Sequence, residues 1–156
     1  MEFNNIKADQ NPVLAGAGIP NYAKITPTGI KAALPILIKT LNKEISFLEK
    51  DLKQKIDEKA SLTWDEVMLP IENIREKLRW SWGVICHLNS VKNSTELRDA
   101  HSAIQPEIVR INNRIGQSKI LFLALNKLKN EKGLLLNKTQ KRILNTELLS
   151  MTHRGV

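Results

Sequence analysis

The chain has 156 residues, of which 42% are hydrophobic and 26% are charged, a balance typical of one globular domain with its own core. Only 4% of the residues are aromatic, so leucine and isoleucine must supply most of the core. The single cysteine, Cys86, excludes an internal disulfide. No apolar run is long enough to span a bilayer and no secretory signal begins the chain, so we expect a cytoplasmic protein without a membrane partner.

The formal net charge of +8 raises the question of an anionic partner. Most of the excess lies from Lys119 onward, where eight basic residues accompany only two acidic ones. Phe122 is the only aromatic residue in that part, so a platform on which nucleic-acid bases could stack is not predicted. We therefore interpret these lysines as solvated helix faces and expect no nucleic-acid partner.

Residues 1–25 are predicted to form an extended arm, because prolines and glycines interrupt them and no hydrophobic period emerges. Thr26 followed by Pro27 is typical of a helix start. Hydrophobic residues then recur at steps of three and four, which predicts a long amphipathic helix from Thr28 to about Lys59. Pro35 lies inside this pattern and is expected to kink the helix or restart it.

A second helix is predicted from Thr63, which forms a capping box with Glu66, to about Leu88. Pro70 is expected to kink it near its start. The polar stretch from Asn89 to Ser94 predicts a corner, in which Ser94 caps the next helix.

Three shorter helices complete the predicted fold. The third carries Pro106 and stops at residues 116–118, a short fourth covers about 120–128, and a turn follows at 130–133. Asn137 or Thr139 caps the fifth, which Gly155 ends. The side chains of the fifth helix expected to face inward are Ile143, Leu144, Leu148 and Leu149. No strand pattern is found, so the predicted fold class is all-α: an antiparallel helical bundle of about five helices over residues 26–156.

The histidines, the cysteine and the acidic residues are not spaced as a catalytic site or a metal site requires. No histidine is followed by glutamate, and no two histidines are spaced as zinc ligands on one helix. Cys86 and His87 are adjacent, but neighbours on a helix point about 100° apart and do not face each other. We therefore interpret Cys86 as a small buried hydrophobic residue and His87 as a hydrogen-bonding residue at a helix end.

Several short segments combine into a pattern that identifies a family. They are Asn11-Pro12-Val13-Leu14, Ile19-Pro20-Asn21-Tyr22 with Ile25-Thr26-Pro27, Thr63-Trp64-Asp65-Glu66-Val67 with Pro70, His87-Leu88-Asn89-Ser90-Val91-Lys92-Asn93-Ser94 with Glu96-Leu97-Arg98, and Thr139-Gln140-Lys141-Arg142. Together they resemble the N-terminal region of the oligopeptidase A group in the thimet oligopeptidase family of zinc metallopeptidases. The central segment is the most specific and differs from the family pattern HLNSVKNSPELR only by Thr95 in place of proline. Pro35 departs from the family's usual proline position.

The resemblance implies an N-terminal wall of a channel that admits short, unstructured peptides. It also implies that the zinc ligands and catalytic glutamate lie on an H-E-x-x-H helix and a later helix, beyond the region this chain resembles. We therefore expect no catalytic residue, no metal ligand and no bound cofactor in this chain, since zinc belongs to the full-length family. The residues that line the channel are not predicted. His87, Asn89, Asn93 and Ser94 are expected to fix the angle between the second and third helices.

The leading interpretation is a non-catalytic N-terminal domain of an oligopeptidase, which is either the product of a truncated or split gene or a segment deliberately cut from a longer protein. The alternative is a stand-alone helical module that binds short peptides or a partner such as the missing catalytic half. A third alternative is a basic nucleic-acid-binding helical protein. If the catalytic half is absent, part of the Leu/Ile stripes should be exposed, so we also expect self-association through an apolar surface.

Overall fold

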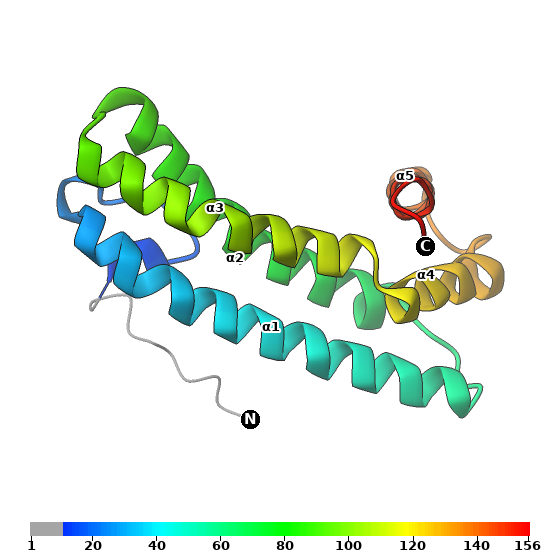
Figure 1. The fold of residues 1–156 in the computed structure, drawn as a ribbon. Coiled ribbons are helices and arrows are strands. Elements are labelled where there is room, and N and C mark those ends of the chain that lie inside the picture. The colour runs from blue at the N-terminus through cyan, green and yellow to red at the C-terminus, as the bar shows by residue number, and fades with distance from the viewer. Residues whose placement is uncertain (1–10) are drawn as a thin grey trace. The chain divides into compact units, whose positions relative to one another are not determined.

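The computed structural model describes residues 11–156, which contain five α-helices and two short 3₁₀ helices and no strand (Figure 1). The α-helices are α1 (Pro27–Asp57), α2 (Trp64–Val91), α3 (Thr95–Gly116), α4 (Lys119–Lys132) and α5 (Lys138–His153). The 3₁₀ helices are η1 (Pro12–Leu14) and η2 (Tyr22–Lys24). The prediction of an all-α fold is confirmed. Within the described residues, no helix combines the length and the apolar character that crossing a bilayer requires.

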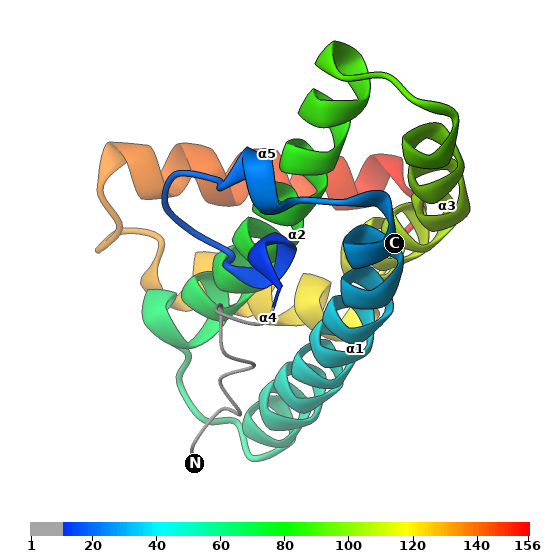
Figure 2. The same ribbon diagram turned by 90° about the vertical axis from the view of Figure 1, so that its left-hand side faces the viewer.

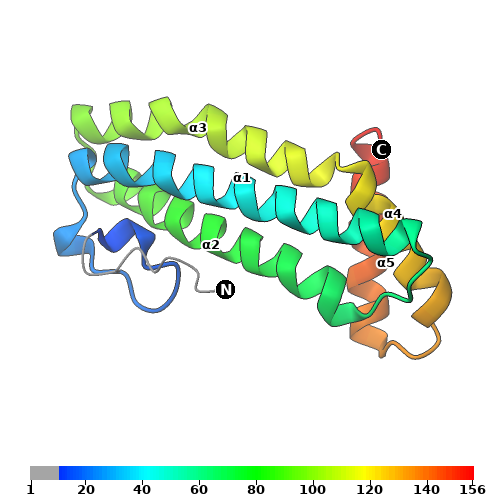
Figure 3. The same cartoon turned by 90° about the horizontal axis from the view of Figure 1, so that it is seen from below.

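Two compact units are built from segments that are distant in the sequence. Among the described residues, the first unit takes in 11–42 together with 74–110, and the second takes in 43–73 and 111–156. Each of α1, α2 and α3 therefore contributes one end to each unit. Within the first unit these three helix ends lie side by side and run in alternating directions (Figure 3).

The first half of α1 forms as its sequence predicts. Thr26 caps the helix by accepting a hydrogen bond from the Gly29 amide at 3.0 Å, and Pro27 occupies the first helical position. The helix then continues through Pro35, so the restart considered for this position does not occur. Leu34 and Leu37 are buried on either side of the proline, and this burial offsets the loss of one backbone hydrogen bond.

The described part of the predicted arm, residues 11–25, belongs to the first unit and lies against its helices (Figure 2). The Asn11 carboxamide accepts from the Val13 amide at 3.1 Å and donates to the Gly29 carbonyl at 2.9 Å. Val13 is fully buried, and its carbonyl accepts from the Ser81 hydroxyl of α2 at 2.8 Å. Within residues 11–25, η1 and η2 are two short 3₁₀ helices, and the hydrogen bonds of Asn11 and Val13 anchor this segment to α1 and α2. Residues 1–10 of the predicted arm lie outside the described residues.

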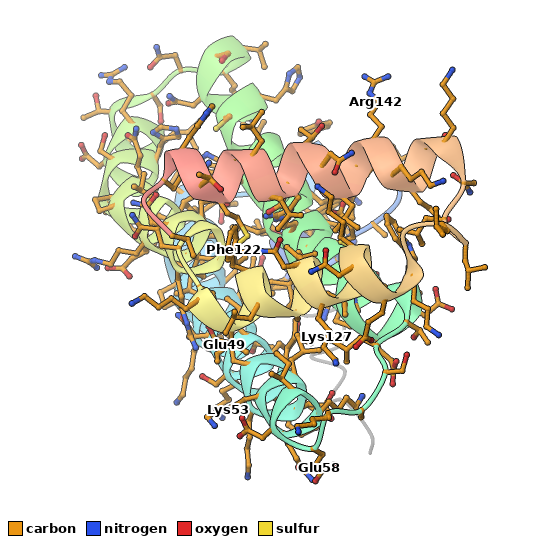
Figure 4. The ribbon with its side chains drawn as sticks, turned by 90° about the vertical axis from the view of Figure 1, so that its right-hand side faces the viewer. Glu49, Lys53, Glu58, Phe122, Lys127 and Arg142 are labelled. Atoms are coloured by element: carbon orange, nitrogen blue, oxygen red, sulfur yellow. The ribbon has the colours of Figure 1, made fainter. Side chains whose placement is uncertain are left out.

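A polar junction joins three helices in the second unit and is centred on Glu49, which Figure 4 labels on α1. The Glu49 carboxylate of α1 accepts from the Arg114 guanidinium of α3 at 3.0 Å and from the Ser118 hydroxyl at 2.7 Å. The same hydroxyl caps α4 by accepting from the Leu121 amide at 3.3 Å. Because Ser118 is buried, these hydrogen bonds replace the water that its hydroxyl would otherwise bind.

The structure changes the expected ends and inward face of the last two helices. Helix α4 continues to Lys132, beyond the start of the turn predicted at 130–133, and a capping box between Asn137 and Gln140 begins α5. Helix α5 packs against α4 and buries Leu144, Leu148 and Met151. The inward placement of Ile143 and Leu149 is wrong, since they are 41% and 57% exposed.

The C-terminal residues close α5 in the way that the glycine predicts. Gly155 has φ +89°, and its amide donates to the Thr152 carbonyl at 3.0 Å. The Val156 amide donates to the Met151 carbonyl at 3.3 Å. These two hydrogen bonds form a Schellman motif, which satisfies carbonyl groups that the helix end would leave unpaired.

Candidate functional site at the corner between α2 and α3

The corner is shorter than the sequence predicts. Helix α2 continues to Val91, so only residues 92–94 separate it from α3, and Asn89 and Ser90 are helical. The Ser90 hydroxyl donates to the Cys86 carbonyl one turn back at 2.9 Å, so its polar group is satisfied within the helix. The prediction that the corner begins at Asn89 is therefore wrong, because the polar side chains of Asn89 and Ser90 do not end the helix.

Asn93 and Ser94 hold the start of α3. The Ser94 hydroxyl accepts from the Leu97 amide at 3.2 Å, which confirms the predicted N-cap. The Asn93 carboxamide oxygen accepts from the Arg98 guanidinium, which also donates to the Thr95 hydroxyl at 3.1 Å. Arg98 thus ties the corner to the first turn of the helix that follows.

His87 and Asn89 lie in other surroundings. The imidazole of His87 contacts the ring of Tyr22, with the ring centroids 5.3 Å apart. The carboxamide oxygen of Asn89 is buried, and no hydrogen-bond partner for it is found among the residues that the structure describes. The structure therefore brings Asn93 and Ser94 together around Arg98, and it places His87 against the N-terminal segment. A joint role of the four residues in fixing the helix angle stays a prediction.

A second cluster, formed by Trp82, Cys86 and His101, was missed in the sequence. The Cys86 Sγ lies 3.6 Å from the His101 Nε2, and the His101 ring stacks on Trp82 with centroids 4.5 Å apart. Trp82 and Cys86 are one turn apart on α2, whereas His101 lies on α3. Cys86 and His101 each lie seven residues from the corner at Asn93 and Ser94, so two antiparallel helices bring them level. This equal separation from the corner was the signal in the sequence from which the contact between Cys86 and His101 could have been predicted.

The Cys86–His101 pair is a hydrogen bond between a thiol and an imidazole. Burial raises the pKa of the Cys86 thiol, so the thiol keeps its proton at neutral pH and can donate it to His101 Nε2. A nucleophilic cysteine needs the opposite shift. The pair provides two donor atoms, whereas structural zinc is held by four ligands and catalytic zinc by three. Over residues 11–156, no group of three or more His, Cys, Asp or Glu side chains is placed to hold a metal ion.

Comparison with known proteins gives the family of the chain. The family described as Neurolysin/Thimet oligopeptidase, N-terminal domain, matches residues 34–156. Oligopeptidase A of Haemophilus influenzae is 37% identical over 120 residues, which cover 77% of this chain and 16% of that protein. The organellar oligopeptidase A of Arabidopsis thaliana is 32% identical over 114 residues, or 73% of this chain and 13% of that protein. Oligopeptidase A of Escherichia coli is 27% identical over 147 residues, or 94% of this chain and 21% of that protein.

These matches confirm the resemblance carried by the sequence motifs. The chain spans only about an eighth to a fifth of the length of these relatives. The matched family is defined by an N-terminal domain, and its match covers most of this chain. The chain therefore belongs to the family of the neurolysin and thimet oligopeptidase N-terminal domain.

Proposed function

We propose that this chain acts as the N-terminal helical domain of an oligopeptidase, in which it forms one wall of the channel that receives short peptides. The observation that carries the proposal is the family match over residues 34–156. The matched relatives are named oligopeptidases, and they are several times longer than this chain. The domain would therefore act together with further polypeptide. We propose a cytoplasmic location, which is supported by the name of one matched relative, a probable cytosolic oligopeptidase A of Arabidopsis thaliana.

We further propose that the chain does not hydrolyse peptides by itself. In a zinc peptidase the metal lowers the pKa of a bound water and polarises the peptide carbonyl. The described residues do not fit such a site, because Cys86 and His101 bond to each other and bring no third ligand. The three histidines are followed by leucine, serine and arginine, so the sequence holds no H-E-x-x-H. The catalytic residues, and the zinc that the family resemblance implies, would lie in the part of the longer relatives that this chain does not match.

Peptide turnover tests this proposal directly. The purified chain is incubated with an internally quenched fluorogenic peptide, with and without added zinc, beside Escherichia coli oligopeptidase A as the active control. We expect no turnover above buffer by the chain alone. Zinc-dependent turnover that a chelator abolishes would overturn the non-catalytic assignment.

Peptide binding separates the domain from the stand-alone module. A fluorescently labelled short peptide is titrated with the chain alone and its anisotropy is measured. If the chain is a channel wall that needs the rest of the enzyme, the peptide should show no saturable binding to it at micromolar concentrations. Saturable binding there would favour the stand-alone peptide-binding module instead.

A further inference from the structure

An exposed apolar turn connects α4 to α5 in the second unit. Leu134 and Leu135 are 96% and 80% exposed, while the next residue, Leu136, is buried and anchors the turn. We call residues 133–136 the leucine turn. Single exposed leucines are ordinary on protein surfaces, but two adjacent ones at full exposure are not explained by the packing of this unit.

Cations surround the leucine turn on the side of α5. Lys138, Lys141 and Arg142 are exposed, and the first turn of α5 holds no acidic residue. Positive charges at a helix N-terminus oppose the helix dipole, so these residues do not serve the stability of α5. The nearby carboxylate of Glu131 pairs with Lys127 at 2.5 Å. The turn therefore combines exposed leucines with an excess of positive charge.

A shallow hollow continues this surface along α5. It has a volume of about 290 Å³ and is lined by Lys138, Thr139, Arg142 and Ile143. Arg142 points away from α4 (Figure 4), and Ile143 offers an exposed apolar side chain. Apolar residues bordered by charged ones are the usual arrangement of a protein interface.

We infer that the leucine turn and the first two turns of α5 form a docking surface for the polypeptide that corresponds to the remainder of the longer relatives. The occupant should offer an apolar recess for Leu134 and Leu135, bordered by carboxylates that face Lys138 and Arg142. This inference rests on the proposed function. It is supported by the unbalanced positive charge of this surface and by the length of the relatives, of which this chain matches at most 21%. A second copy is disfavoured because it would bring the same cations face to face.

Co-purification tests the docking surface. The full chain is co-expressed with Haemophilus influenzae oligopeptidase A from which the matched segment has been deleted, and the complex is captured through a tag on the chain. Two variants alter the surface: Leu134→Ser with Leu135→Ser, and Lys138→Glu with Arg142→Glu. Phe47→Ser is the matched control, since Phe47 is a large apolar residue of the same unit that is 67% exposed.

We expect the wild-type chain and Phe47→Ser to retain the complex, and each surface variant to reduce the captured partner at least about ten-fold. Circular dichroism verifies that the variants remain helical. If both surface variants capture as much partner as the wild type, the docking surface is overturned while the proposed function stands. If the wild-type chain captures none, the proposed function falls with it.

Two measurements on the chain alone exclude other occupants. We expect a monomer at near-physiological salt, and no sedimentation with vesicles of phosphatidylcholine, with or without phosphatidylglycerol. A dimer at near-physiological salt that the Leu134→Ser, Leu135→Ser variant dissolves would identify a second copy as the occupant. Binding to anionic vesicles that the same variant loses would identify a lipid surface. Either result would overturn the inference.

Discussion

Ser81 shows what one buried hydroxyl contributes. It is fully buried on α2 and donates to the carbonyl of Val13, which is itself buried. The change Ser81→Ala leaves that carbonyl without its partner, so we expect the free energy of unfolding to fall by about 1 to 3 kcal/mol. Urea unfolding followed by circular dichroism measures this.

Ser90→Ala is the matched control for this prediction. Ser90 lies on the same helix and its hydroxyl also donates to a carbonyl, but it is exposed, so water replaces the lost bond. We expect a change within about 0.5 kcal/mol. Equal losses in the two variants would show that burial of the Ser81–Val13 bond contributes nothing.

At the scale of helices, the spacing of hydrophobic residues predicted the fold. The details that it predicted wrongly have identifiable causes. The caps at Thr26, Thr63 and Ser94 are where the sequence places them, because each depends on residues within one turn. The predicted inward face of α5 was wrong because Ile143 and Leu149 each neighbour a buried leucine. Adjacent residues on a helix point in different directions, so two apolar neighbours cannot both face the core of the protein.

The Cys86–His101 contact could not be predicted from residue spacing within single helices. The two side chains meet only because α2 and α3 turn back at the corner, so the contact depends on tertiary packing. Comparing histidines within single helices could not find it. The exposure of Leu134 and Leu135 was equally hidden, since three consecutive leucines do not show by themselves which of them faces the core.

The cap of α2 makes helix stability depend on pH through Glu66. Its carboxylate accepts from the Thr63 hydroxyl at 2.7 Å and the Thr63 amide at 2.9 Å, and Lys55 lies 3.1 Å away. The Thr63 hydroxyl first, and then Lys55, hold the pKa of Glu66 below its usual 4.5. A lowered pKa stabilises the fold above the ordinary value, and this contribution is lost as the pH falls through the folded pKa.

Glu66→Gln keeps a hydrogen-bond acceptor at the cap but cannot titrate. We expect the wild type to lose more stability than the variant between about pH 6 and about pH 3, by less than about 1 kcal/mol because the side chain is partly exposed. Urea unfolding at the two pH values measures the difference. Lys55→Met, which leaves the Thr63 bonds in place, should keep the larger part of the pH dependence. Equal losses in the wild type and Glu66→Gln would contradict the assignment.

For the whole molecule, net charge and exposed apolar area act in opposite directions on self-association. The charge of +8 repels a second copy, and Lys138, Lys141 and Arg142 place part of that repulsion next to the leucine turn. Exposed apolar side chains such as Leu134, Leu135 and Phe47 favour association. Which effect prevails depends on ionic strength, because salt screens the repulsion and leaves apolar burial intact.

We therefore expect the chain to be monomeric at about 0.1 M salt and to self-associate reversibly at about 1 M, where the screening length falls from about 10 to about 3 Å. Sedimentation velocity measures the mass, against 17.7 kDa for one chain. Leu134→Ser with Leu135→Ser should remain monomeric at high salt, because it removes most of the exposed apolar area of the turn. Association that weakens as salt increases would contradict this balance, since it would require attraction between oppositely charged faces instead of apolar burial.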